Sequence, residues 1–159
     1  MTEAKTQTAG VIAPPPLIFL GALILAVALD WWVVRTQGLD MPASLRWTVV
    51  PLLLLAGIAL IAAAMGQFRR AGTPAPPWQP TTAFVARGVY RFTRNPMYLG
   101  MTLIYLALGI AADAPVIFWL LIPLVLTVQY GVIAREERYM AAKFGTPYVD
   151  YFHTVPRWL

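Results

Sequence analysis

Four long apolar stretches restrict this chain to one class of fold. They cover residues 17–34, 47–68, 95–112 and 114–134, and Asp30 is the one charged residue among them. A helix needs about 20 predominantly apolar residues to cross a bilayer, where it satisfies its own backbone hydrogen bonds. The sequence therefore predicts an all-α integral membrane protein with four transmembrane helices. The last continues past the apolar zone, which places the helices at about 17–34, 47–68, 95–112 and 114–144.

The composition supports a membrane location and excludes several kinds of site. Hydrophobic residues make up 59% of the 159 residues and charged residues 12%, whereas a soluble domain carries about 25% charged residues. The absence of cysteine excludes a disulfide framework, a thiolate metal site and a cysteine nucleophile. His153 is the single histidine, so we expect no zinc site and no metal partner. At this length we expect one domain, residues 1–159.

The basic residues predict which side of the membrane each loop faces. Residues 69–94 carry no acid and hold Arg69, Arg70, Arg87, Arg91 and Arg94. Residues 135–159 hold four more basic side chains, whereas the turn between the third and fourth helices has none. By the positive-inside rule, the long second loop and both termini face the cytoplasm. The arginines also suit anionic lipid head groups, and no nucleic-acid motif accompanies them, so we expect the lipid bilayer and no nucleic acid as a partner.

A proline-rich stretch at residues 73–80 lies within the second loop. Its four prolines forbid a regular helix and favour an extended conformation. The segment is either a linker or a lid over a cytoplasmic site. Because nothing in it is chemically distinctive, we interpret it as a linker.

The third helix begins at an Asn-Pro pair. Asparagine is a strong N-cap residue and proline is favoured at the first helical position, so Asn95 and Pro96 predict the helix start. Arg94 lies beside this N-terminus, whose free N–H groups and partial positive charge can hold an anion. The segment is therefore either a capped membrane helix with a topogenic arginine or part of an anion site.

Two adjacent glutamates follow the last apolar stretch. Glu136 and Glu137 are expected on a helix that ends at Gly145. They are interpreted either as part of a solvated amphipathic helix or as groups that hold a cation or accept a proton. The aromatic tail at residues 146–159 either anchors at the membrane interface or caps the ends of the third and fourth helices, and its tyrosine faces can bind a cation.

Two motifs flanking the third and fourth helices resemble the signatures of the isoprenylcysteine carboxyl methyltransferase family. Phospholipid N-methyltransferases share a similar pattern. The first motif, G-x-Y-x-x-x-R-[HN]-P-x-Y-x-G, matches residues 88–100. The second is a glutamate pair, a hydrophobic residue, F-G-x-x-Y-x-x-Y and a terminal V-x-R, and it matches residues 136–157. The resemblance covers residues 85–159 with both motifs in the family's order.

The resemblance implies methyl transfer from S-adenosylmethionine to a lipid-like or other apolar acceptor at the cytoplasmic membrane face. The residues implied as cofactor contacts are Tyr90, Arg94, Asn95, Pro96, Tyr98, Glu136, Glu137 and Tyr148. The family often has histidine where Asn95 stands, and asparagine cannot titrate.

Candidate catalytic roles go to Glu137, as a base for an amine acceptor, and to Arg157, as a guide for an acidic acceptor. A prenylcysteine-type carboxylate, an amine and a thiol all remain open as acceptors. Two other interpretations also remain: a sterol-type membrane reductase that uses NADPH, and a non-catalytic membrane subunit of the same fold.

Overall fold

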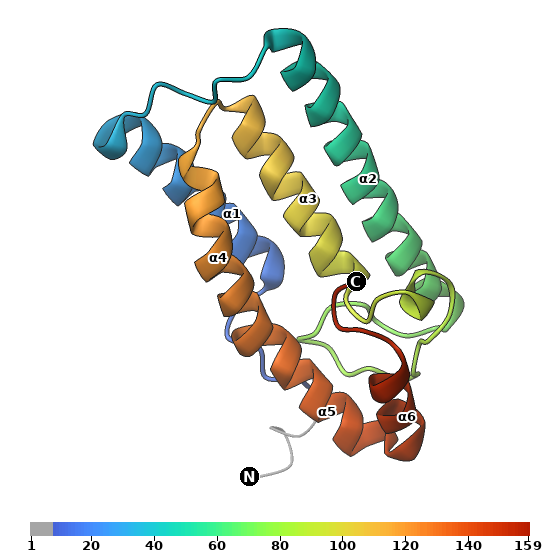
Figure 1. Ribbon diagram of the computed structural model, residues 1–159. Helices are drawn as coiled ribbons and strands as arrows, with labels where there is room; N and C mark the ends of the chain where they lie inside the picture. The colour runs from blue at the N-terminus through green and yellow to red at the C-terminus, as the bar shows by residue number, and fades with distance from the viewer. Residues whose placement is uncertain (1–7) are drawn as a thin grey trace.

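The computed structural model describes residues 8–159, and all the regular secondary structure in this range is helical (Figure 1). Helix α1 (Pro15–Ala28) runs into the π-helical turn η2 (Leu29–Val34), and α2 (Ala43–Arg70) follows. A long loop contains the 3₁₀ turn η3 (Gly88–Arg91) and leads to α3 (Pro96–Ala111). Helix α4 (Val116–Val128) continues through the π-helical turn η4 (Gln129–Ile133) into α5 (Ala134–Phe144), and α6 (Thr146–Thr154) completes the fold. The expected all-α class is confirmed.

Within residues 8–159, three continuous helices are long and apolar enough to cross a membrane: Pro15–Val34, Ala43–Arg70 and Val116–Phe144. Helix α3 is apolar but has 16 residues, or roughly 24 Å at 1.5 Å per residue. A hydrocarbon core is about 30 Å thick, so α3 is short for a span of its own. The chain is therefore an integral membrane protein, while four spans with cytoplasmic termini remain a prediction.

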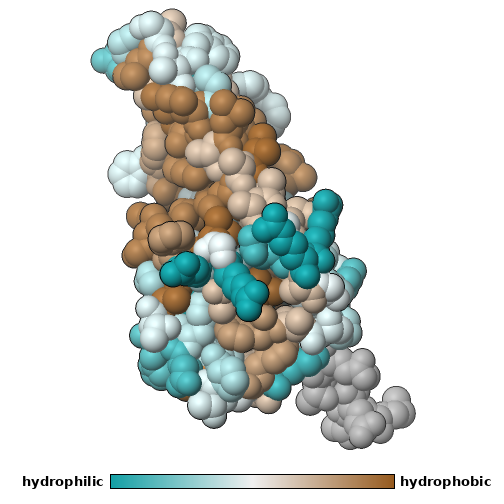
Figure 2. All heavy atoms as spheres, turned by 90° about the vertical axis from the view of Figure 1, so that its right-hand side faces the viewer, coloured by the Kyte–Doolittle hydropathy of each residue, from teal (hydrophilic) through white to brown (hydrophobic). Residues whose placement is uncertain are grey.

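The last long helix extends beyond the membrane-spanning zone. Its 29 residues measure roughly 43 Å, which exceeds the hydrocarbon thickness by about 13 Å. All its charged side chains lie in α5, from Arg135 onwards. Figure 2 shows a similar division on the α2 face, where apolar side chains dominate below a paler upper tip and the most hydrophilic side chains gather in the lower half. We therefore place α5 outside the spanning part, together with α6 and the second loop.

Glycines set the close crossing of α2 and α3, which lie side by side (Figure 1). A Cβ atom on Gly100 would lie 2.8 Å from the carbonyl oxygen of Gly57 and 2.7 Å from Ile61. A Cβ atom on Gly57 would in turn lie 2.7 Å from the Gly100 carbonyl oxygen. The last glycine of the first motif thus lets two backbones meet and holds the start of α3 against α2.

A tight turn joins α3 and α4, as the short sequence between the two apolar runs predicts. Asp113 adopts a left-handed backbone conformation with φ of 56°. Its Oδ1 accepts a hydrogen bond from the Leu39 amide at 2.8 Å and pairs with Arg46. The turn therefore ties the first loop to the hairpin at the end of the molecule away from α5.

The C-terminal tail folds back over the start of α3 (Figure 1). Gly145 ends α5 with φ of 61°, as expected, and the following residues form α6 rather than an irregular tail. The amide of Arg94 donates to the carbonyl of Pro156 at 3.0 Å. The tail is therefore a cap on this end of the hairpin, the second of the two interpretations of its aromatic sequence.

Candidate functional site

A cavity of about 280 Å³ lies at the end of the molecule that carries α5 and α6. Its wall combines the start of α1 with the segment before it, α2, the second loop, the start of α3, α5 and α6. Both sequence motifs contribute to it, although they are separated by the α3–α4 hairpin. Of the candidate cofactor contacts, the lining includes Tyr90, Arg94, Asn95, Tyr98, Glu136, Glu137 and Tyr148. The fold therefore brings together at one cavity most of the residues selected from the sequence.

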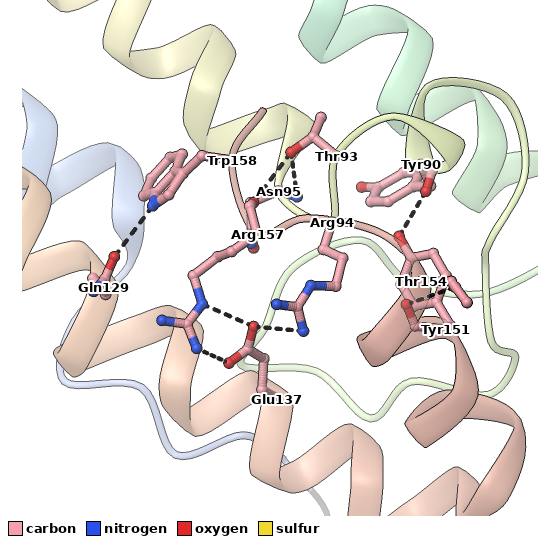
Figure 3. A network of polar contacts seen from close by, with 10 residues as sticks. All are labelled: Tyr90, Thr93, Arg94, Asn95, Gln129, Glu137, Tyr151, Thr154, Arg157 and Trp158. Atoms are coloured by element: carbon pink, nitrogen blue, oxygen red, sulfur yellow. Dashed lines mark hydrogen bonds and ion pairs between the residues drawn. The ribbon is translucent and has the colours of Figure 1, made fainter.

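Two arginines clamp the carboxylate of Glu137 (Figure 3). Arg157 donates from Nε to Oε1 at 3.0 Å and from Nη2 to Oε2 at 2.5 Å. Arg94 Nη1 lies 3.1 Å from Oε1 in a second ion pair. The side chains of Arg94 and Glu137 are each 9% exposed and that of Arg157 is 29% exposed. Glu137 is thus fully engaged by protein cations and is held in one position.

Arg94 keeps donor capacity at the cavity wall. Its guanidinium carbon lies 3.9 Å from the centre of the Phe152 ring, a cation–π contact that fixes the side chain. Its Nε atom is buried and has no hydrogen-bond acceptor among residues 8–159. Nε of Arg46 and of Arg135 is likewise buried without an acceptor in this range, so what sets Arg94 apart is the place of its guanidinium in the cavity lining, where a cation suits an anionic group.

The backbone of the tail is tied to the first motif. The Arg157 carbonyl accepts hydrogen bonds from Asn95 Nδ2 at 2.9 Å and from Thr93 Oγ1 at 3.1 Å (Figure 3). Asn95 therefore occupies the N-cap position before Pro96, as expected, but its side chain does not cap the helix. Its Nδ2 instead donates to the tail, which ties the start of α3 to Arg157.

Glu136 differs from its neighbour in having no arginine partner among the described residues. Its Oε1 accepts a hydrogen bond from the Tyr98 hydroxyl at 2.7 Å. Burial raises the pKa of the Glu136 carboxyl to about 7, the Tyr98 hydrogen bond opposes this rise, and the charge on Glu137 adds to it. Near neutral pH this carboxyl therefore changes charge, and it does so at the cavity wall.

Aromatic rings form another part of the wall. Phe84 meets Tyr148 and Tyr151 edge to face, with ring centroids 5.6 and 5.2 Å apart. The Tyr151 hydroxyl donates to the Tyr90 carbonyl at 2.7 Å, which fixes α6 against η3 (Figure 3). Burial raises the pKa of Tyr148 to about 12, so its ring stays neutral and electron-rich. Such faces attract a cation.

The proline-rich stretch forms part of the cavity wall. Residues 75–78 belong to the lining, and Trp78 is among them. The Thr73 hydroxyl accepts from the Thr82 amide at 2.7 Å, which closes the stretch into a loop, and the Thr81 amide donates to the Tyr139 hydroxyl at 3.3 Å. These contacts correct the interpretation as a linker, because the segment is closed into a loop, is bonded to α5 through Thr81 and forms part of the site wall.

Two predicted site residues lie outside the cavity lining, and several lining residues escaped prediction. Pro96 is buried at the start of α3, and Arg157 reaches the site through its contacts with Glu137 and Asn95. The unpredicted part of the lining includes four methionines, which are Met65, Met97, Met101 and Met140. Met97 and Met101 occupy positions that lie one turn apart on α3, beside Tyr98. Their helical spacing was the one sequence feature that could have placed them together at the cavity, but the same spacing is typical of any buried helix face.

Comparison with known families gives one match. A family model described as phospholipid methyltransferase matches residues 45–153, from α2 to α6. No curated protein and no solved structure matches the chain. The matched range starts well before residue 85 and ends before Arg157, so it includes the α2–α3 crossing but not the arginine that completes the clamp.

Proposed function

The chain belongs to the phospholipid methyltransferase family, a family of integral membrane methyltransferases, and on this premise we propose that it methylates a lipid-like acceptor with S-adenosylmethionine as donor. We further propose that the site faces the cytoplasm, where the basic second loop is expected. The observation that carries the proposal is the charge pattern of one cavity. Its described lining contains one cation, Arg94, and two carboxyl groups, Glu136 and Glu137.

This charge pattern complements the donor. S-adenosylmethionine carries a carboxylate, an ammonium group and a sulfonium, for a net charge of +1. With both carboxyl groups ionised, the lining carries a net charge of −1. The guanidinium of Arg94, which lines the cavity, suits the donor carboxylate, and ionised Glu136 suits a cationic group. NADPH is polyanionic, and a lining with one cation and two carboxylates opposes its phosphates.

The clamp gives Glu137 and Arg157 positioning roles in this proposal. Glu137 is paired on both oxygens, so it is poorly placed to take a proton from an acceptor. It instead holds Arg94 at the cavity wall, and Arg157 holds Glu137 from the opposite side. Glu136, which lacks such a pair, is the carboxyl free to respond to a ligand's charge.

Catalysis would then rest on alignment. When bound, the donor supplies an electrophilic methyl group, and displacement at this carbon requires the acceptor atom in line with the departing sulfur. The neutral rings of Tyr148 and Tyr151 suit the sulfonium, and the methionine side chains suit an apolar acceptor. Holding both reactants in one geometry supplies a rate gain equivalent to a large effective concentration.

A ligand-binding experiment tests the proposal. Purified protein in detergent is heated with S-adenosylhomocysteine, S-adenosylmethionine or NADPH, and the unfolding temperature is recorded. We expect both adenosyl compounds to raise it and NADPH to leave it unchanged. Arg94→Gln should abolish the rise, whereas Arg91→Gln, which neutralises an exposed arginine three residues away, should retain it.

Stabilisation by NADPH alone would favour the reductase. No stabilisation by any of the three compounds would favour a non-catalytic subunit. Equal stabilisation of the two arginine variants by the adenosyl compounds would refute the assignment of Arg94.

A further inference from the structure

A second, separate cavity of about 210 Å³ lies between α1 and α3. Helix α1 contributes Phe19, Leu20 and Leu23, and α3 contributes Ile104, Tyr105 and Leu108. The single polar side-chain group among these six is the Tyr105 hydroxyl, which already donates to the Ile117 carbonyl at 3.0 Å. The walls therefore offer no free hydrogen-bonding side chain, and they suit hydrocarbon alone.

This groove opens on the outer surface of the helices. Phe19 and Tyr105 are buried and form its floor. Leu20 and Leu108 form its rim and are 51% and 40% exposed. Because α1 lies within an apolar span and α3 packs against it, the rim faces the lipid phase.

The groove and the donor cavity share part of their walls. Pro16, at the start of α1, and Met101, on α3, line both. Met101 lies three residues after Tyr98, whose hydroxyl contacts Glu136, and seven residues before Leu108. One face of α3 thus leads from the donor cavity to the lipid, and the ten residues from Tyr98 to Leu108 span about 15 Å.

We propose that this groove holds a hydrocarbon chain of the methyl acceptor while the acceptor's head turns past Pro16 and Met101 into the donor cavity. This inference rests on the proposed function and assigns the acceptor's chain a site in it. The acceptor is then an amphiphile with a chain that extends along α1 and α3. The wall that it shares with the donor cavity sets this groove apart from the lipid-facing side of α2, because α2 contributes to that cavity near its loop end.

Photocrosslinking tests the groove without requiring the acceptor's identity. The probe is hexadecanol with a diazirine near the chain end, added to the protein in nanodiscs of saturated phosphatidylcholine. We expect saturable labelling on α1 and α3 around Leu20 and Leu108, with competition by plain hexadecanol. Leu20→Trp should reduce this labelling at least about tenfold, the effect of losing burial of roughly two methylene groups. Leu52→Trp, at an exposed position on α2, is the matched control and should leave it unchanged.

Leu108→Trp blocks the opposite rim and provides a second variant if the first does not fold. Labelling that is non-saturable and equal on α2 would show that bulk lipid fills the groove and would overturn the inference. Unchanged labelling in a folded rim variant would do the same. Binding of S-adenosylhomocysteine is measured in parallel and should be unaffected by either rim variant. Failure of that binding in the wild type refutes the proposed function, whereas failure of the labelling alone refutes the groove.

Discussion

Replacing Glu137 with glutamine should lower the stability of the protein, whereas the same replacement of Glu136 should not. Glu137→Gln removes the carboxylate between Arg94 and Arg157 and leaves two cations facing a neutral amide. Two of these three side chains are 9% exposed, so water replaces little of the lost charge interaction.

The magnitude follows from this burial. Removing one partner of a buried ion pair costs about 3–5 kcal/mol, and the greater exposure of Arg157 places the expected loss near the lower end. For a chain of this size, about 3 kcal/mol corresponds to a decrease in unfolding temperature of roughly 6–12 °C. Glu136 has no arginine partner among the described residues, and burial raises the pKa of its carboxyl to about 7. The fold thus favours its neutral form, and Glu136→Gln should match or slightly exceed the wild type.

The assay is thermal unfolding of the wild type and both variants in one detergent, without ligand. Glu136→Gln is the matched control, because it makes the same chemical change one residue away. An unfolding temperature for Glu137→Gln equal to that of the wild type would refute the clamp. An equal loss in both variants would refute the division of roles between the two glutamates.

Three further results are expected. Affinity for S-adenosylmethionine, measured by calorimetry, should rise with pH by up to about tenfold between pH 6 and 8, because Glu136 with a pKa of about 7 becomes ionised in this range. Glu136→Gln should remove this pH dependence. A pH dependence that persists in this variant would implicate another group. Gly100→Ala places a Cβ atom 2.8 Å from an α2 carbonyl oxygen and should cost about 1–3 kcal/mol, whereas Gly66→Ala, with open space around it, should be tolerated in the same denaturation assay. Tyr151→Phe loses a buried hydrogen bond of 2.7 Å and should cost about 1 kcal/mol; an unchanged stability would show that this bond does not hold α6 in place.

Sequence patterns determined the helices well, because long apolar runs have few alternatives in a membrane. The starts expected at residues 17, 47, 95 and 114 correspond to helices that begin at Pro15, Ala43, Pro96 and Val116. The continuation of the last helix to residue 144 and its termination at Gly145 are also confirmed. These features depend on local chemistry, on prolines at helix starts and on a glycine at a helix end.

The contacts of the tail could not be predicted in the same way. The partner of Asn95 is a carbonyl 62 residues later, and the partner of Arg157 is a carboxylate 20 residues earlier. No periodicity relates such positions, because the return of the tail depends on how α6 packs against the loop. Helix α6 itself is nine residues long and starts directly after a glycine, so its sequence resembles an irregular aromatic segment.

The part of the cavity lining that comes from the proline-rich stretch could not be predicted for a different reason. Its residues carry no charged group, and chemistry alone therefore gave no reason to place them at a site. Their role depends on position, since hydrogen bonds of Thr73 and Thr81 hold the segment at the cavity wall. The motif glycine at position 100 is similar, because its function is visible only when the backbone of α2 is beside it.

Methyl transfer into lipid is the most direct test of the central claim. Membranes that contain the protein are incubated with S-adenosylmethionine labelled in its methyl group, and the organic extract is counted and analysed by mass spectrometry. We expect labelled lipid-soluble product with the wild type and with Arg91→Gln, and none with Arg94→Gln. A folded wild-type protein that binds the donor but leaves the organic extract unlabelled would contradict the claim.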